Sequence, residues 1–83
     1  MTLREFVKMV SSTHGVYTKI AISRQSGKGF SGRSGDTWID SILGFSFCAR
    51  EEYGDDWGLG KVPVIGLEII ETHNDNILCA IIE

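Results

Sequence analysis

Cysteine is scarce in this sequence, and long apolar runs are absent from it. The two cysteines, Cys48 and Cys79, sit in apolar surroundings, so we expect two buried free thiols of a cytosolic protein rather than a disulfide. No apolar run approaches the roughly 20 residues that span a bilayer, which excludes a membrane-spanning helix. The amphipathic N-terminus MTLREFVKMV has no small-residue cleavage site, so we expect no signal peptide. Internal repeats and low-complexity segments are also missing.

The chain has the length and composition of one small globular domain. Its 83 residues, 42% of them hydrophobic and 23% charged, suffice for one hydrophobic core but not for a second. Ile, Val, Leu and Phe recur throughout the chain, which argues against intrinsic disorder. We therefore expect a single domain over residues 1–83, whose burial is supplemented by a partner subunit or a ligand.

Charge is divided unevenly along the sequence. Residues 1–35 carry six Lys or Arg and one Glu, a net charge of +5, whereas residues 36–83 carry two Lys or Arg and ten carboxylates, a net charge of −8. Such a division is typical of a chain that faces a charged partner surface, and it also occurs where the two parts neutralise each other in the fold. The total charge of −3 disfavours direct nucleic-acid binding, although the basic N-terminal half keeps it as an alternative.

The first part of the sequence predicts a helix followed by a strand. Four apolar residues recur at helical spacing, namely Leu3, Phe6, Val7 and Val10. Thr2 and Glu5 fit a capping box, so a helix is expected over residues 2–12. Gly15 suits the turn that ends it. Residues 16–23 alternate between an apolar and a half-polar face, which predicts a strand.

The later part of the sequence predicts a helical turn, a strand and a C-terminal hairpin. Residues 37–50 begin with apolar side chains at helical spacing and continue with Phe45 and Phe47 in alternation, so we expect a helical turn and then a strand. Residues 64–71 and 77–83 are β-rich and flank the turn-forming segment THNDN, which predicts a hairpin. The last strand is apolar on both faces, as is typical of a central strand.

Together these elements predict an α+β fold. The N-terminal helix packs on a small antiparallel sheet of three or four strands that ends in the C-terminal hairpin. One helix covers only one face of such a sheet. The other face then needs either the segment 38–47 or a second subunit, and the second alternative predicts a homodimer.

A glycine-rich basic loop follows the first predicted strand over residues 23–36, SRQSGKGFSGRSGD. Its segment Gly27–Gly32 matches G-x-G-x-x-G, but no long helix follows to face a pyrophosphate, so a dinucleotide site is not expected. A Walker A loop needs Ser or Thr after Gly-Lys, and glycine stands there. An anion site built from Arg24, Lys28, Arg33 and backbone N–H groups remains one alternative. The other is a mobile hairpin tip.

Four carboxylates surround two large aromatic side chains in the segment 51–60. This acidic aromatic loop comprises Glu51, Glu52, Tyr53, Asp55, Asp56 and Trp57. A solvated loop, a cation or general acid–base site and a protein-interaction patch all fit its composition. Among the functional alternatives we favour the interaction patch, because large aromatics suit a binding hot spot and 83 residues leave little room for a catalytic pocket.

Signatures of metal binding and catalysis are weak elsewhere. His14, Cys48, His73 and Cys79 show neither C-x-x-C nor H-x-x-x-H spacing. No Ser/His/Asp arrangement with a known signature is present. We therefore predict no metal, no cofactor and no catalytic residue, and a small enzyme is the least favoured alternative.

The chain begins with MTLREFVKMV, continues with VYTKIAIS and closes with VIGLEIIETHNDNILCAIIE. In these segments it resembles short proteins encoded by phages and other bacterial mobile elements. Proteins of this size and origin include anti-CRISPR proteins, which inhibit host defence. The resemblance implies a cytoplasmic inhibitor in a bacterial host, acting on a larger complex such as a CRISPR-type defence nuclease.

These observations lead to two functional hypotheses. The first is a non-enzymatic binding protein whose acidic aromatic loop meets a basic surface of a protein partner, within a nucleic-acid-handling complex. Arg24, Lys28 and Arg33 then contact acidic groups or guide RNA. The second is a protein that sequesters a nucleotide or another phosphate at the glycine-rich loop, across a dimer.

Overall fold

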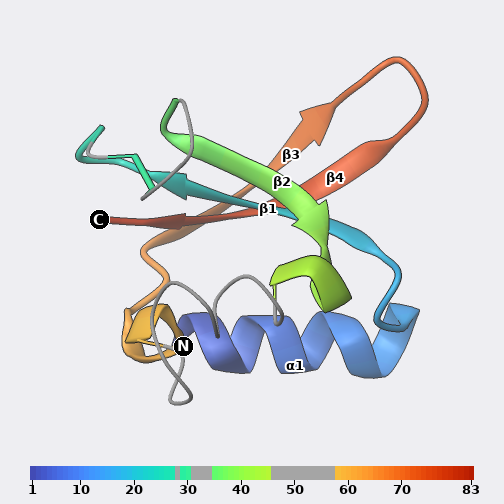
Figure 1. Ribbon diagram of the computed structural model, residues 1–83, viewed down its shortest axis with the longest axis horizontal. Helices are drawn as coiled ribbons and strands as arrows, with labels where there is room; N and C mark the ends of the chain where they lie inside the picture. Colours follow the sequence, from blue (N-terminus) through green and yellow to red (C-terminus); the bar gives the residue numbers. More distant parts are fainter. Residues whose placement is uncertain (28, 31–34, 46–57) are drawn as a thin grey trace.

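A computed structural model describes residues 1–27, 29–30, 35–45 and 58–83 of the chain. Within these residues one helix lies beneath a four-stranded sheet (Figure 1). The elements in chain order are α1 (Leu3–His14), β1 (Lys19–Arg24), β2 (Thr37–Ser41), the 3-10 helix η1 (Gly58–Lys61), β3 (Gly66–Glu71) and β4 (Asn76–Ile82). The α+β arrangement with an N-terminal helix and a C-terminal hairpin is confirmed.

Helix α1 begins and ends where local chemistry dictates. The capping box is formed: the Glu5 N–H donates to Thr2 Oγ1 at 3.2 Å, and the Thr2 N–H donates to Glu5 Oε1 at 2.9 Å. The helix continues past the expected residue 12 until Gly15, which has φ 87° and donates its N–H to the carbonyl of Ser11. All four residues of the apolar stripe are buried against the sheet.

The sheet is mixed, with strand order β2-β1-β4-β3. Strands β1 and β2 pair antiparallel, as do β3 and β4, whereas β1 and β4 pair parallel. The expectation of a wholly antiparallel sheet is therefore wrong for the central pair. Its physical reason is connectivity: a short turn forces antiparallel pairing, but β1 and β4 are separated by a long stretch of chain that permits either direction.

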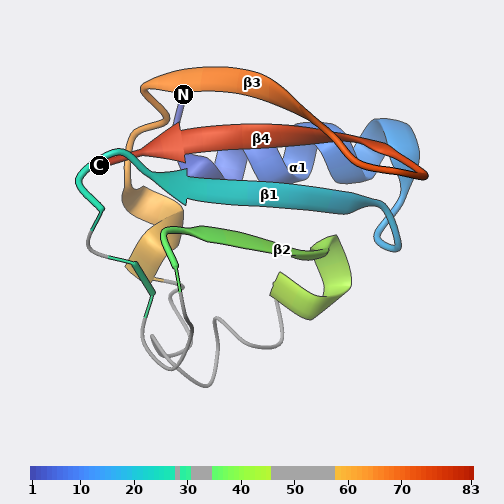
Figure 2. The ribbon, with the colours of Figure 1, turned by 90° about the horizontal axis from the view of Figure 1, so that it is seen from above.

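Strand β4 lies between β1 and β3, which confirms the prediction of a central last strand. Ala80 and Ile82 pack in the cluster that contains the α1 stripe. Cys79 points to the opposite face, where it forms a smaller cluster with Ala21 and Ile77. Figure 2 shows no described helix or strand over that second face.

The segment after the glycine-rich loop contains the expected elements in reversed order. Residues 37–41 form the strand β2, and the helical turn follows over residues 42–45. Trp38 lies opposite Ile22 of β1 in the ladder, which holds it in a strand. Ser41 then caps the turn, since its Oγ accepts the Gly44 N–H at 3.0 Å. The prediction of a strand through Phe45 is wrong, and Phe47 lies outside the described residues.

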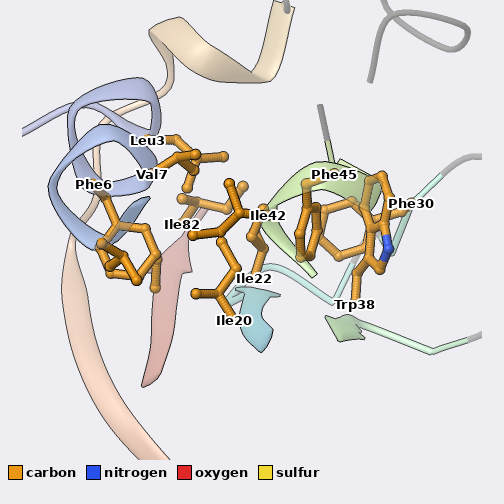
Figure 3. Packing of buried hydrophobic residues seen from close by; sticks show 12 residues of the cluster. Leu3, Phe6, Val7, Ile20, Ile22, Phe30, Trp38, Ile42, Phe45 and Ile82 are labelled. Atoms are coloured by element: carbon orange, nitrogen blue, oxygen red, sulfur yellow. The ribbon is translucent and has the colours of Figure 1, made fainter. Parts of the chain in front are cut away.

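The same segment covers the α1 side of the sheet and not the opposite face. Figure 3 shows Trp38, Phe45 and Phe30 side by side, in the same cluster as the α1 residues but separated from them by Ile22 and Ile42. The Trp38 ring lies 4.4 Å from the Phe45 ring and 5.6 Å from the Phe30 ring, centroid to centroid. These residues extend the core beneath β1 and β2. The expectation that the segment 38–47 covers the second face of the sheet is therefore wrong for its described residues 38–45.

Strand β1 is shorter at its start than the predicted residues 16–23. It begins at Lys19, because Val16 and Tyr17 lie in the turn after α1 and are exposed. The Leu43 N–H donates to the Val16 carbonyl at 2.8 Å, which connects this turn to the helical turn after β2.

Candidate functional site

Strand β3 is an edge strand with a row of backbone groups that point away from the sheet. The Thr72 N–H donates to the Asp75 carbonyl at 2.8 Å, just beyond the end of the ladder. Since backbone groups in an antiparallel pair face the partner at every second residue, the groups of Ile70 and Glu68 also face β4. Those of Leu67, Ile69 and Glu71 therefore point outward.

A β-bulge marks the start of this free edge. The Ile65 N–H donates to the Ile81 carbonyl at 2.8 Å, although Gly66 is the register partner of Ile81. Two residues thus lie opposite one, which is the definition of a bulge. Just before it, the Val64 N–H donates to the Met1 carbonyl, so the chain that leads into β3 is paired with the N-terminus. Among the described residues no strand pairs with the outer side of β3, so the free edge runs from Leu67 to Glu71.

Two apolar side chains of this edge strand are exposed. Leu67 and Ile69 lie opposite Ala80 and Leu78, which places them on the α1 side of the sheet. They are nevertheless 52% and 59% exposed. Figure 1 shows that the hairpin end of β3 and β4 rises away from α1, so the helix does not cover that end of the strand. Exposed apolar residues on a strand with free backbone groups favour pairing with another chain.

Strand β3 and the hairpin turn carry acidic side chains. Residues 62–83 contain four carboxylates and no Lys or Arg. Glu68 and Glu71 are exposed on β3 itself, and Asp75 is exposed in the turn. Burial raises the pKa of the Cys79 thiol to about 11, and the charge of Glu68, its register partner, adds to this effect. Glu68 therefore places a carboxylate directly opposite a residue of the neighbouring strand β4.

Arg24 is the one residue of the predicted anion site that lies within the described part of the chain. Its Nη1 donates to the Glu83 carbonyl at 3.0 Å, and its guanidinium lies 5.1 Å from the centroid of the Phe30 ring. These contacts connect the end of β1 to the C-terminus and to the aromatic part of the core. Lys28 and Arg33 lie outside the described residues, so an anion site with all three cations stays a prediction.

The acidic aromatic loop, Glu51 to Trp57, also lies outside the described residues. Its role in partner binding stays a prediction. The β3 edge was not among the predicted sites, although the alternation of Leu67 and Ile69 with carboxylates in a hairpin without cations was visible in the sequence. The strand order cannot be deduced from the sequence, and this order decides whether Leu67 and Ile69 face solvent.

The described part of the chain offers little that resembles a cofactor site. Among its residues, no group of three or more His, Cys, Asp or Glu side chains is placed to hold a metal ion. An open depression of about 340 Å³ lies between the turn after α1 and the hairpin turn. It is lined by Tyr17, Thr18, Lys19, Asp75, Asn76 and Ile77.

The function of this chain has to be inferred from its geometry, because comparisons with known proteins give no match. The chain matches no protein-family model, no curated protein and no solved structure. None of the helices in the described residues has the length and apolar character needed to cross a bilayer.

Proposed function

We propose that this protein is a non-enzymatic binding protein, which takes up an extended segment of a partner protein as an additional strand along β3. The observation that carries this proposal is the free edge of β3, where the outward backbone groups of Leu67, Ile69 and Glu71 accompany two exposed apolar side chains. In this mode of recognition, backbone hydrogen bonds supply affinity and alternate side chains supply specificity.

The exposure of Leu67 and Ile69 supports a functional role for the edge. Natural edge strands are usually short, bulged or charged, so that they do not pair with other chains. Strand β3 has such a bulge at its start and two carboxylates among its six residues, but Leu67 and Ile69 stay exposed beyond the bulge. The part between the bulge and the turn keeps three residues with outward groups, which is enough for a short intermolecular ladder.

The proposal includes the role expected from the sequence, the inhibition of a larger host complex. In this proposal the protein inhibits a larger complex by occupying a segment that the complex needs. A bacterial defence nuclease stays the proposed kind of target. The acidic aromatic loop then provides a second contact, outside the described residues.

Selection from a library of displayed random 12-residue peptides tests the proposed function. We expect selected peptides to change the NMR signals of the Leu67, Ile69 and Glu71 amides and to slow their hydrogen exchange. Ile69→Pro removes one outward donor without removing a hydrogen bond to β4, so it should abolish binding and retain the fold. Selected peptides that leave these amides unchanged, or that bind Ile69→Pro equally well, contradict strand addition at β3.

A further inference from the structure

We infer that the segment taken up by β3 is basic, with Lys or Arg at two defined positions of an antiparallel strand. This inference rests on the proposed function and names the chemistry of its partner. The starting point is the register: because the backbone groups of Leu67, Ile69 and Glu71 point outward, an antiparallel strand forms its hydrogen-bonded pairs opposite these three residues.

The register assigns a side-chain preference to each partner residue. Residues directly opposite in an antiparallel pair share one face of the sheet, and opposite charges stabilise such pairs. From its N-terminal end, the incoming strand meets Glu71, Ile70, Ile69, Glu68 and Leu67 in this order. Its first and fourth residues are therefore basic, and its second, third and fifth residues are apolar. The resulting pattern is [Lys/Arg]-apolar-apolar-[Lys/Arg]-apolar.

Charge also argues against a second copy of this chain as the occupant of the edge. Pairing β3 with β3 of another copy brings four glutamates together on two hairpins that contain no Lys or Arg. The sheet's other edge strand, β2, has the sequence TWIDS, which contains Asp40 and no cation. Neither edge of a second copy thus offers cations to Glu68 and Glu71. A basic segment of another protein does.

The test uses synthetic peptides of one length and two charges. The basic peptide carries Lys-Val-Val-Arg-Leu between Gly-Ser flanks, and the matched control carries Glu-Val-Val-Glu-Leu between the same flanks. We expect fluorescence anisotropy to show binding of the basic peptide at least tenfold tighter than that of the control. The difference should shrink as salt is raised, because the charges are exposed to solvent. In Glu68→Lys/Glu71→Lys, the preference should reverse.

Backbone methylation separates strand addition from simple charge attraction. In the antiparallel register, the N–H groups of the first, third and fifth peptide residues point at β3. N-methylation of these residues should abolish binding of the basic peptide. N-methylation of the second and fourth residues, whose N–H groups point away, should leave binding within about twofold of the unmodified peptide. Equal effects of the two modifications contradict the register.

The outcomes distinguish the partner's chemistry from the proposed function. Library-selected peptides that perturb the outward amides of β3 but show no preference for Lys or Arg overturn the basic partner and leave strand addition intact. Peptides that never perturb those amides overturn both. A dimer in analytical ultracentrifugation whose outward β3 amides are protected from exchange overturns the inference in favour of a second copy.

Discussion

Replacing isoleucine with threonine at positions 22 and 69 tests whether the apolar side chains of β3 are dispensable for folding. Ile22 is fully buried in the core, whereas Ile69 is 59% exposed. Both residues lie in strands of one sheet. Threonine keeps the β-branch and the preference for strands, so the two variants differ mainly in how much burial they lose.

The expected free energies of unfolding follow from these exposures. Full burial of an isoleucine side chain contributes about 1.5–3 kcal/mol, and a buried hydroxyl without a partner costs about 1–3 kcal/mol. Ile22→Thr should therefore lower the free energy of unfolding by about 3 kcal/mol. At Ile69 less than half of this burial is present, and the new hydroxyl stays hydrated. The loss there should be below about 1 kcal/mol.

Urea denaturation followed by circular dichroism measures both losses. A domain of this length has a total stability of about 4–12 kcal/mol, so Ile22→Thr removes a large share of it. If that variant does not fold, Ile22→Val serves instead, with an expected loss of about 0.5–1.5 kcal/mol, and Ile69→Val is its control. Equal losses at the two positions refute the reasoning, because they mean that Ile69 is packed in solution.

Four further predictions concern the framework of the fold. Thr2→Ala removes the capping hydroxyl and should cost about 1 kcal/mol in urea denaturation. The backbone and hydroxyl of Thr2 lower the pKa of the Glu5 carboxyl. Ionised Glu5 therefore stabilises the folded state above the pKa that Glu5 has in the unfolded chain, and this stabilisation is lost as the pH falls through the folded-state pKa. Glu5→Gln should remove this pH dependence of the free energy of unfolding. The Cys79 thiol, with its pKa raised to about 11, should react with maleimide at pH 8 only after unfolding, and rapid labelling of the native protein, located by peptide mass spectrometry, contradicts its burial. Arg24→Ala loses the contact with the Phe30 ring and should lower stability by about 1–2 kcal/mol in phosphate-free buffer, whereas unchanged stability shows that this contact is not structural.

The parts of the fold that were predictable from sequence are those fixed by local chemistry. The capping box and the apolar stripe of α1 lie within 12 residues of each other, and both are formed. The hairpin follows from two β-rich runs around a short polar turn, and its antiparallel direction is set by that turn. The double apolar face of β4 predicted its central position, because each face must be buried.

The parts that were not predictable depend on contacts between distant segments. The parallel pairing of β1 with β4 joins residues about 60 positions apart, such as Ile20 and Leu78, and no local pattern specifies its direction. In the same way, Trp38 has helical spacing with its neighbours but is held in a strand opposite Ile22. Tertiary pairing overrides the local pattern there. The predicted loop sites fall largely outside the described residues, so the sequence is still the basis for them.

The carboxylates of the hairpin connect the strand order to the proposed function. Strand β4 has no charged residue over Asn76–Ile82, whereas β3 contains Glu68 and Glu71. If β3 occupied the central position, Glu71 would lie on the face that α1 covers, and burying an unpaired carboxylate costs several kcal/mol. The sheet avoids that cost by placing β4 inside and β3 at the edge. Glu71 therefore favours the edge position of β3, and Glu68 and Glu71 together give this edge its negative charge. A basic strand is the partner that neutralises these two carboxylates while it covers Leu67 and Ile69.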